Sequence, residues 1–152
     1  MNPAAAPLVP THPALHRRVQ DSFERQGMLA QLGVRLVRVE PGVCELALPH
    51  SDKVTQQQGG FHGGAMGALA DVAGGYAALT VAPEGMEVTT VEYKINFLSA
   101  RQGGTLHATG RVVKAGRRLI VTAAEIVHVG ADGKTTGCAV MQQTLMPVAK
   151  TY

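Results

Sequence analysis

The chain of 152 residues is 45% hydrophobic and 16% charged, which is typical of one ordinary globular domain and excludes a disordered or fibrous protein. The formal net charge of +3 is uneven, because residues 93–150 hold eight Lys and Arg against two acids, whereas residues 1–92 hold six against nine. The basic part predicts an anionic partner, and a phosphorylated small molecule fits it better than nucleic acid, since there is no Trp and few aromatic residues for stacking.

The N-terminal segment divides into two parts. Residues 1–12 begin with MNPAAAPLVP, which is rich in Pro and Ala and lacks the basic start of a signal peptide, so a disordered lead-in is expected. From Pro13 to Leu32 apolar residues recur near helical spacing, and Gly33 suits the end of a helix. These features predict an amphipathic helix on the outside of a single domain covering residues 13–149.

Two short strands and a loop are expected next. Residues 33–39 and 43–49 are alternating or β-branched runs, and Glu40, Pro41 and Gly42 between them are typical of a hairpin turn. Residues 51–60 then form a polar loop that leads into the most apolar part of the chain.

That apolar part is residues 61–82, where Asp71 is the only charged residue. A membrane span of about 20 residues is disfavoured, because a carboxylate at its centre costs roughly 2.5–3.5 kcal/mol. The segment is instead predicted to be a buried helix. An ionised carboxylate there calls for a buried partner or for a role in chemistry, so Asp71 is either a structural cap or the main catalytic candidate.

The start of this helix is a second candidate feature. His62, Gly63 and Gly64 place uncrowded backbone where the first N–H groups of a helix lack internal partners. Such a terminus attracts negative charge, including the oxyanion of a carbonyl under attack. Gly67 and Gly74 follow at helical spacing and predict the close approach of a neighbouring sheet.

Four further strands are predicted after the helix. Residues 88–98 alternate, which would place Thr90 and Tyr93 on opposite faces. Turn-like segments separate three more strands, at residues 105–113, 119–129 and 135–146. The element order predicts an α+β domain, in which an antiparallel sheet of about five or six strands wraps around one long buried helix.

Cysteine and histidine usage carries two further expectations. Cys44 and Cys138 lie far apart without a C-x-x-C pair, which favours reduced, buried thiols in a cytoplasmic protein. The one H-x-x-x-H pair, His12 and His16, has no acidic companion nearby, so no metal site is expected.

The helix motif resembles that of the hotdog-fold acyl-CoA thioesterases. His62-Gly63-Gly64 is followed by Asp71 nine positions after the His, and VEYKINFLSA and GRRLIVTAAEI downstream are also similar to this family. The resemblance runs from about residue 33 to 147 and is to the branch of the phenylacetic-acid-degradation (PaaI-like) and type II 4-hydroxybenzoyl-CoA thioesterases. It implies the hotdog fold and hydrolysis of a coenzyme A thioester without metal or organic cofactor.

The resemblance also implies roles for individual residues. The Gly63 N–H would polarise the thioester carbonyl, and Asp71 would be the nucleophile or the general base for water. Thr90 matches a Ser or Thr that assists the acid in some members, although an ordinary strand threonine is an open alternative. His62 serves the turn in many members, and Gly75 stands where other members use a threonine.

The loop before the helix holds an amide that the family uses for the substrate carbonyl or the attacking water. Gln56 stands at that position, and a shift of the loop would substitute Gln57 or Gln58. The phenylacetate branch usually has Asn there, whereas some 4-hydroxybenzoyl-CoA thioesterases have Gln. The acyl group therefore stays open between aromatic, short-chain and medium-chain acids.

Substrate contacts are expected beyond these residues. Gly64 and Phe61 flank the motif, and apolar side chains are candidate pocket walls, namely Phe61, Met66, Tyr76 and Phe97. Four cations are candidates for the coenzyme A phosphates, with solvated surface charge as the alternative: Arg101, Lys114, Arg117 and Arg118.

The resemblance implies a homo-oligomer, a dimer or a homotetramer built as a dimer of dimers, with active sites at a subunit interface that covers an exposed sheet edge. Neither nucleic acid nor membrane is an expected partner. Two alternatives stay open, a non-catalytic acyl-CoA-binding module and a hotdog dehydratase or hydratase.

Overall fold

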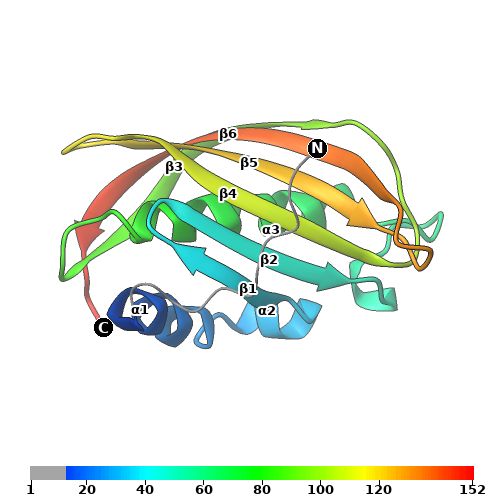
Figure 1. Ribbon diagram of the computed structural model, residues 1–152, viewed down its shortest axis with the longest axis horizontal. Coiled ribbons are helices and arrows are strands. Elements are labelled where there is room, and N and C mark those ends of the chain that lie inside the picture. Colours follow the sequence, from blue (N-terminus) through cyan, green and yellow to red (C-terminus); the bar gives the residue numbers. More distant parts are fainter. Residues whose placement is uncertain (1–12) are drawn as a thin grey trace.

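The computed structural model describes residues 13–152, so the expected lead-in over residues 1–12, with His12, lies outside the described residues. Six antiparallel strands form one sheet in the order β1-β2-β4-β5-β6-β3, which curves around the long helix α3 (Figure 1). The predicted α+β architecture is confirmed. The strands are β1 (Arg35–Glu40), β2 (Val43–Pro49), β3 (Met86–Phe97), β4 (Thr105–Ala115), β5 (Ile120–Val129) and β6 (Thr135–Ala149); the helices are α1 (Pro13–Phe23), α2 (Gly27–Leu32) and α3 (Gly63–Leu79), with a 3-10 turn at Asp52–Val54.

The single N-terminal helix predicted over residues 13–32 is wrong, because the chain breaks between α1 and α2. Val19 and Leu29 are both fully buried. Both side chains pack into the same core, one from each helix.

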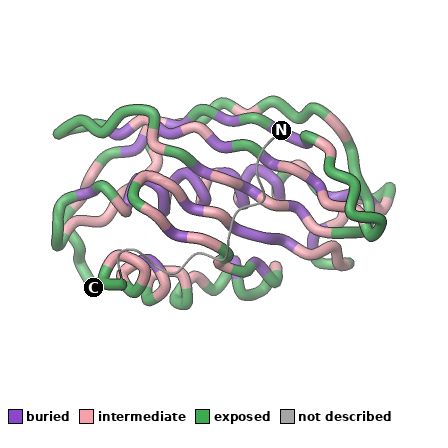
Figure 2. The backbone as a smooth tube through the Cα atoms, viewed as in Figure 1, coloured by how far each residue is buried: buried purple, intermediate pink, exposed green. Residues whose placement is uncertain are grey.

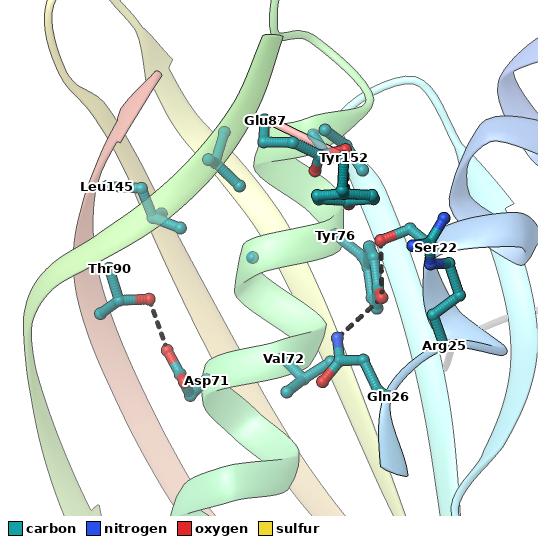
Figure 3. Close-up of a pocket in the computed structure, with 13 residues that line it drawn as sticks. Ser22, Arg25, Gln26, Asp71, Val72, Tyr76, Glu87, Thr90, Leu145 and Tyr152 are labelled. Atoms are coloured by element: carbon teal, nitrogen blue, oxygen red, sulfur yellow. Dashed lines mark hydrogen bonds between the residues drawn. The ribbon is translucent and has the colours of Figure 1, made fainter. Parts of the chain in front are cut away.

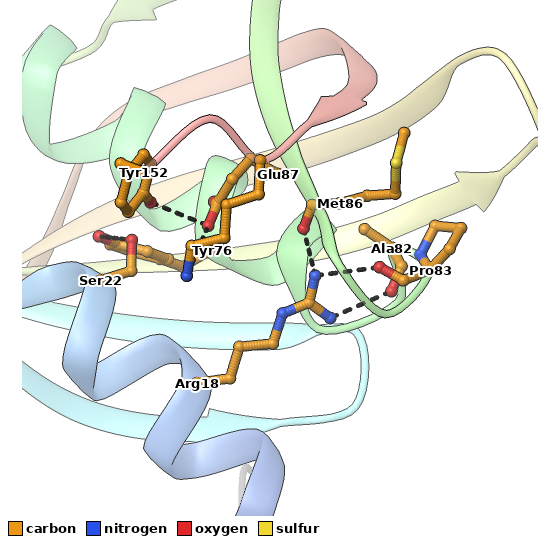
Figure 4. A network of polar contacts seen from close by, with 9 residues as sticks. Arg18, Ser22, Tyr76, Ala82, Pro83, Met86, Glu87 and Tyr152 are labelled. Carbon is orange, nitrogen blue, oxygen red and sulfur yellow. Dashed lines mark hydrogen bonds and ion pairs between the residues drawn. The ribbon is translucent and has the colours of Figure 1, made fainter.

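The guanidinium of Arg18 ties α1 to the connection between α3 and β3. It donates to the carbonyl oxygens of Ala82 at 3.2 Å and Pro83 at 3.1 Å, and also to that of Met86 (Figure 4). Two of these carbonyls lie between α3 and β3, and that of Met86 belongs to the first residue of β3. The N-terminal helix is therefore held next to the end of α3.

Helix α3 lies within the curve of the sheet, and Figure 2 shows buried residues gathered along it and on the strands that surround it. Small residues set its distance from the sheet, as the glycine spacing predicted. A Cβ on Gly110 of β4 would lie 2.2 Å from the carbonyl oxygen of Ala73, and one on Gly74 would lie 2.1 Å from Oε1 of Gln143. Within residues 13–152, no helix has the length and apolarity needed to traverse a bilayer.

Strand β3 departs from the predicted alternation. Its pairing with β6 shifts register between Thr90 and Glu92, which makes Val91 a bulge. As a result Thr90 and Tyr93 both face α3, whereas simple alternation would separate them. Strand β3 is also a sheet edge, and Val91 and Phe97 on it are 58% and 53% exposed.

Both cysteines are free and fully buried, as predicted. Burial raises the pKa of Cys44 to about 12, which suppresses the reactive thiolate. We expect the folded protein to react very slowly with Ellman's reagent at about pH 8. Two thiols should appear at once when denaturant is added, whereas rapid reaction of the native protein would contradict the packing around β2.

Candidate active site

Asp71 lies half-buried on α3 and faces β3 and β6. Oδ1 of its carboxylate accepts a hydrogen bond from Oγ1 of Thr90 at 2.7 Å (Figure 3) and a second one from Nε2 of Gln143. Nε2 of Gln143 also lies 2.9 Å from Oγ1 of Thr90. Within residues 13–152, Oδ2 of Asp71 has no hydrogen-bond partner and no cation pairs with the carboxylate. One oxygen is thus held and the other is open to a reacting molecule.

Gln143 is the residue of this cluster that the sequence interpretation missed. It is 1% exposed, its Nε2 also donates to the Asp71 carbonyl at 3.1 Å, and its Oε1 accepts from Oγ1 of Thr122 at 2.8 Å. A buried amide satisfied at both ends holds a fixed orientation. The available signal was its place between Met141 and Leu145 on the inward face of β6, where a polar residue is unexpected.

The start of α3 carries the second group of expected site residues. His62 is the N-cap, and its Nδ1 accepts from the Gly64 N–H at 2.8 Å. A neutral His62 therefore carries its ring proton on Nε2. The Gly64 N–H is already used, whereas the Gly63 N–H has no acceptor among residues 13–152. The ring of Phe97 lies 3.3 Å from where a Cβ on Gly63 would stand, so a larger residue at this position would press against that ring.

Gln56 belongs to this second group. It lies in the loop that precedes α3, where its N–H donates to the Gly60 carbonyl at 2.9 Å. It is half-buried, and its Oε1 accepts from the Gln58 N–H. Gln57 and Gln58 are exposed, so Gln56 is the member of the run that the local turn orders.

The two groups are well separated within one chain. Gly63 and Asp71 are eight residues apart on one helix, which corresponds to roughly 12 Å along its axis. A donor and an acid that act on one carbonyl must both lie within about 3 Å of it. One chain therefore presents two half-sites, with Thr90 beside Asp71 at one and with His62 beside Gly63 at the other, where Gln56 lies in the loop that leads into the helix.

The four expected phosphate contacts are divided between opposite ends of the molecule. Arg101 lies in the loop before β4, and its carbonyl accepts from the N–H of buried Phe61 at 2.9 Å, close to the start of α3. The other three cations are exposed in the β4–β5 hairpin at the far end (Figure 1): Lys114, Arg117 and Arg118. The four do not form one cluster in a single chain.

A cavity of about 470 Å³ opens beside Asp71 and Thr90 (Figure 3). Of the expected pocket walls, Tyr76 lines it, whereas Phe61, Met66 and Phe97 do not. Ser22 and Gln26 from the α1–α2 connection and the C-terminal Tyr152 line it as well, which no local pattern indicated. The rest of the lining consists of two charged residues, one glycine and four apolar side chains: Arg25, Glu87, Gly75, Val72, Leu79, Val88 and Leu145.

Comparisons with known proteins identify the family of this chain. Residues 58–132 match the family model described as thioesterase superfamily, a span that includes His62, Asp71 and Thr90 but neither Gln56 nor Gln143. A crystal structure of a thioesterase family protein from Silicibacter pomeroyi is 38% identical with a TM-score of 0.86, and the match covers 90% of this chain and 99% of that one.

Two further similarities are more distant. The structure of the E. coli PaaI protein from the phenylacetic acid degradation operon has a TM-score of 0.78 at 23% identity and covers 90% of this chain and 95% of that one, which shows a shared fold. A 1,4-dihydroxy-2-naphthoyl-CoA hydrolase of Listeria monocytogenes is 32% identical over 92 residues, which are 60% of this chain and 74% of that protein.

Proposed function

We propose that this member of the thioesterase superfamily cleaves a thioester between coenzyme A and an organic acid. The chain belongs to that superfamily, has the hotdog fold and is therefore an enzyme that hydrolyses thioesters. The acid is aromatic or of short to medium chain length. The name of the Listeria relative supports a coenzyme A thioester. So does the basic balance of residues 93–150, which suits the phosphates of coenzyme A.

The half-held carboxylate of Asp71 is the observation that carries the proposal. Oδ2 attacks the thioester carbonyl to form a mixed anhydride that water then hydrolyses, or it takes the proton of a water that attacks the carbonyl directly. In either case the carbon–sulfur bond breaks, coenzyme A leaves as the thiol with a proton that comes from the water, and the free acid is released. Thr90 and Gln143 hold Oδ1 and so aim Oδ2. The step consumes only water, so we propose that no metal or organic cofactor takes part.

Gly63 supplies the oxyanion donor in this scheme. Its N–H lies at the positive end of α3, where developing negative charge on the carbonyl oxygen is stabilised. Loss of one such donor costs about 2.7–4 kcal/mol of transition-state stabilisation in other hydrolases. The Gln56 amide, in the loop that leads into α3, holds the carbonyl or the water in this scheme.

The separation of the half-sites supports an active site made from two chains. Edge strand β3 exposes apolar side chains and unpaired backbone, which a second copy of the chain covers in a symmetric dimer. In that dimer Gly63 and Gln56 of one chain face Asp71 and Thr90 of the other. Two dimers form the proposed tetramer, and the free buried thiols support a cytoplasmic location.

Mixed dimers test this arrangement. Gln56→Ala and Asp71→Asn chains, each impaired alone, are co-expressed with different tags and the mixed species is purified. Every mixed dimer then has one site with both changes and one intact site, so the purified mixed dimer should show about half of wild-type activity.

The control pairs Asp71→Asn with a chain that carries both substitutions, because no intact site can form in that mixture and no activity should return. Restoration in the control, or sedimentation of the wild-type protein only as a monomer at micromolar concentration, would contradict the two-chain site.

Product analysis separates the proposal from its alternatives. Mass spectrometry after incubation with acyl-CoA should detect free acid and coenzyme A in equal amounts. An enoyl thioester would indicate a dehydratase or hydratase, and unchanged substrate would indicate a binding module. The dehydratase reading needs a histidine that works with the acid, whereas His62 is engaged at the helix cap, nine residues from Asp71.

A further inference from the structure

We propose that Thr122 on β5 is a positioning residue that acts on Asp71 through Gln143, and that this Thr122–Gln143 pair determines which oxygen of the carboxylate reacts. Oγ1 of Thr122 donates to Oε1 of Gln143 at 2.8 Å, and Nε2 of Gln143 donates to Asp71. The inference rests on the proposed function, because it explains how one carboxylate oxygen is held while the other stays open. It adds strand β5 to the elements that build the active site.

The pair stands out on the inward face of the sheet. Thr122 and Gln143 lie opposite each other where β5 pairs with β6, and they are 0% and 1% exposed. Their inward-facing neighbours on the two strands are buried and apolar, namely Ile120, Ala124, Met141 and Leu145. A hydrogen bond between buried neutral groups adds little net stability, so apolar residues would serve the fold as well. The pair instead meets the one carboxylate of α3, which gives it a role in the site.

Only one orientation of the Gln143 amide fits its surroundings. Its Nε2 lies within hydrogen-bond distance of three oxygens, namely the Asp71 carbonyl at 3.1 Å, Oγ1 of Thr90 at 2.9 Å and Oδ1 of Asp71. If the amide were reversed, its oxygen would face two Asp71 oxygens that can only accept hydrogen bonds. The Thr122 hydroxyl satisfies Oε1 at the other end of the amide. Gln143 therefore presents donors to Asp71.

This orientation also sets the direction of the Thr90 hydroxyl. An N–H of Gln143 donates to Oγ1 of Thr90, so the hydrogen of that hydroxyl points at Oδ1 of Asp71, 2.7 Å away (Figure 3). The hydrogen bonds of Gln143 and Thr90 thus run toward the carboxylate. Oδ1 is occupied by two donors, and Oδ2 is the oxygen left to attack the carbonyl or to take a proton.

The carboxylate is held without being neutralised. Both donors to Oδ1 are uncharged, and Asp71 takes part in no ion pair within residues 13–152. A lysine or arginine at position 143 would stabilise the charged form of Asp71 and so weaken it as a base. Neutral donors fix the orientation of the carboxylate and leave its charge available for the reaction.

The surface of α3 leaves space for the pair at Gly74, three residues after Asp71. A Cβ there would lie 2.1 Å from Oε1 of Gln143 and 2.7 Å from Oγ1 of Thr122. A side chain at this position would therefore push the amide away from the helix. The glycine allows the Thr122–Gln143 pair to pack directly against the turn of α3 that follows Asp71.

Thr122→Val and Thr122→Ser test the pair directly, because Val keeps the volume and removes the hydroxyl, whereas Ser keeps the hydroxyl. Release of coenzyme A from benzoyl-CoA and hexanoyl-CoA is followed with Ellman's reagent, per folded molecule. We expect Thr122→Val to lower kcat by about fivefold or more, since Oε1 of Gln143 loses its donor and the amide shifts. KM should change less than about twofold, and kcat of Thr122→Ser should stay within about twofold of the wild type.

Gln143→Met removes the amide at similar length and volume. We expect kcat to fall about 10- to 100-fold with little change in KM, because a misplaced reacting group raises the barrier more than it weakens binding. Gln142→Met, the same change at the adjacent exposed position of β6, is the matched control and should leave kcat as in the wild type.

The Asp71→Asn background separates positioning from general disruption. Gln143 acts through the carboxylate, so Gln143→Met should lower the residual kcat of Asp71→Asn by less than about twofold. A role limited to packing of the sheet would give the same loss in both backgrounds. If Gln143→Met does not fold, the comparison of Thr122→Val with Thr122→Ser decides the inference.

Four outcomes would overturn the inference while the proposed function stands. They are equal kcat for Thr122→Val and Thr122→Ser, a folded Gln143→Met with wild-type kcat, an equal loss with and without Asp71→Asn, and a loss that appears in KM alone. A wild-type protein that releases no coenzyme A from either thioester, or an Asp71→Asn protein with wild-type kcat, would instead contradict the proposed function, and the inference with it.

Discussion

Asp71→Asn is expected to lower kcat by a factor on the order of 10²–10⁴, the usual effect of removing a general acid or base. Asn keeps the volume of the side chain, and its amide oxygen still accepts from Thr90 and Gln143. Only the carboxylate that attacks or takes a proton is lost. Thermal stability should stay the same or rise, because a half-buried charge without a cationic partner disappears.

The measurement is kcat and melting temperature on one preparation, with the fraction of folded protein determined alongside. Asp52→Asn, the same change at an exposed position of the 3-10 turn, is the matched control and should alter neither quantity. If Asp71 were a structural cap, the substitution would lower the melting temperature and leave turnover per folded molecule nearly intact. A stable variant with wild-type kcat would exclude Asp71 from the chemistry.

Gly110→Ala is expected to destabilise the protein by more than about 3 kcal/mol, beyond the common range for overpacking in a core. The added Cβ would lie 2.2 Å from the carbonyl oxygen of Ala73 and 2.6 Å from the backbone nitrogen of Gly74. Both contacts are to helix backbone, so no side chain can turn away to relieve them. Strand β4 and helix α3 would have to move apart.

The expected observation is a greatly lowered melting temperature or accumulation of insoluble protein. Gly137→Ala is the matched control, since Gly137 also lies in a strand but has nothing within 4 Å of an added Cβ. This control should remain folded with stability close to the wild type. A Gly110→Ala protein that melts within a few degrees of the wild type would show that α3 does not lie as close to β4 as the structure has it.

The long helix, its carboxylate and its N-terminal His-Gly-Gly motif could be predicted from the sequence, because each depends on a local pattern. An apolar segment with one carboxylate predicts a buried helix, and His62, Gly63 and Gly64 mark its start since helix termini favour a side-chain acceptor and uncrowded backbone. Strand β2 was predicted with its exact bounds, and the other strands to within a few residues, because alternation and turn residues are also local.

The partners of Asp71 were beyond this kind of reasoning. Gln143 donates to Asp71 across 72 residues of chain, and no periodic pattern links the two positions. Thr90 was singled out by family resemblance, but simple alternation placed it on the wrong side of β3 relative to Tyr93. The bulge at Val91 turns both side chains toward α3. The bulge is a feature of the pairing between β3 and β6, so the alternation within β3 does not predict it.

The same distinction holds for the cavity and for the N-terminal helices. Helical spacing predicts one helix over residues 13–32, whereas in the structure the chain breaks between α1 and α2, and Val19 and Leu29 reach the core from separate helices. That break brings Gln26 against Tyr76, 50 residues further along the chain. The sequence by itself determined which helix carries Asp71 and where that helix begins, because local periodicity and backbone requirements specify both. The tertiary structure decided which residues surround Asp71, because those contacts join residues that no local rule relates.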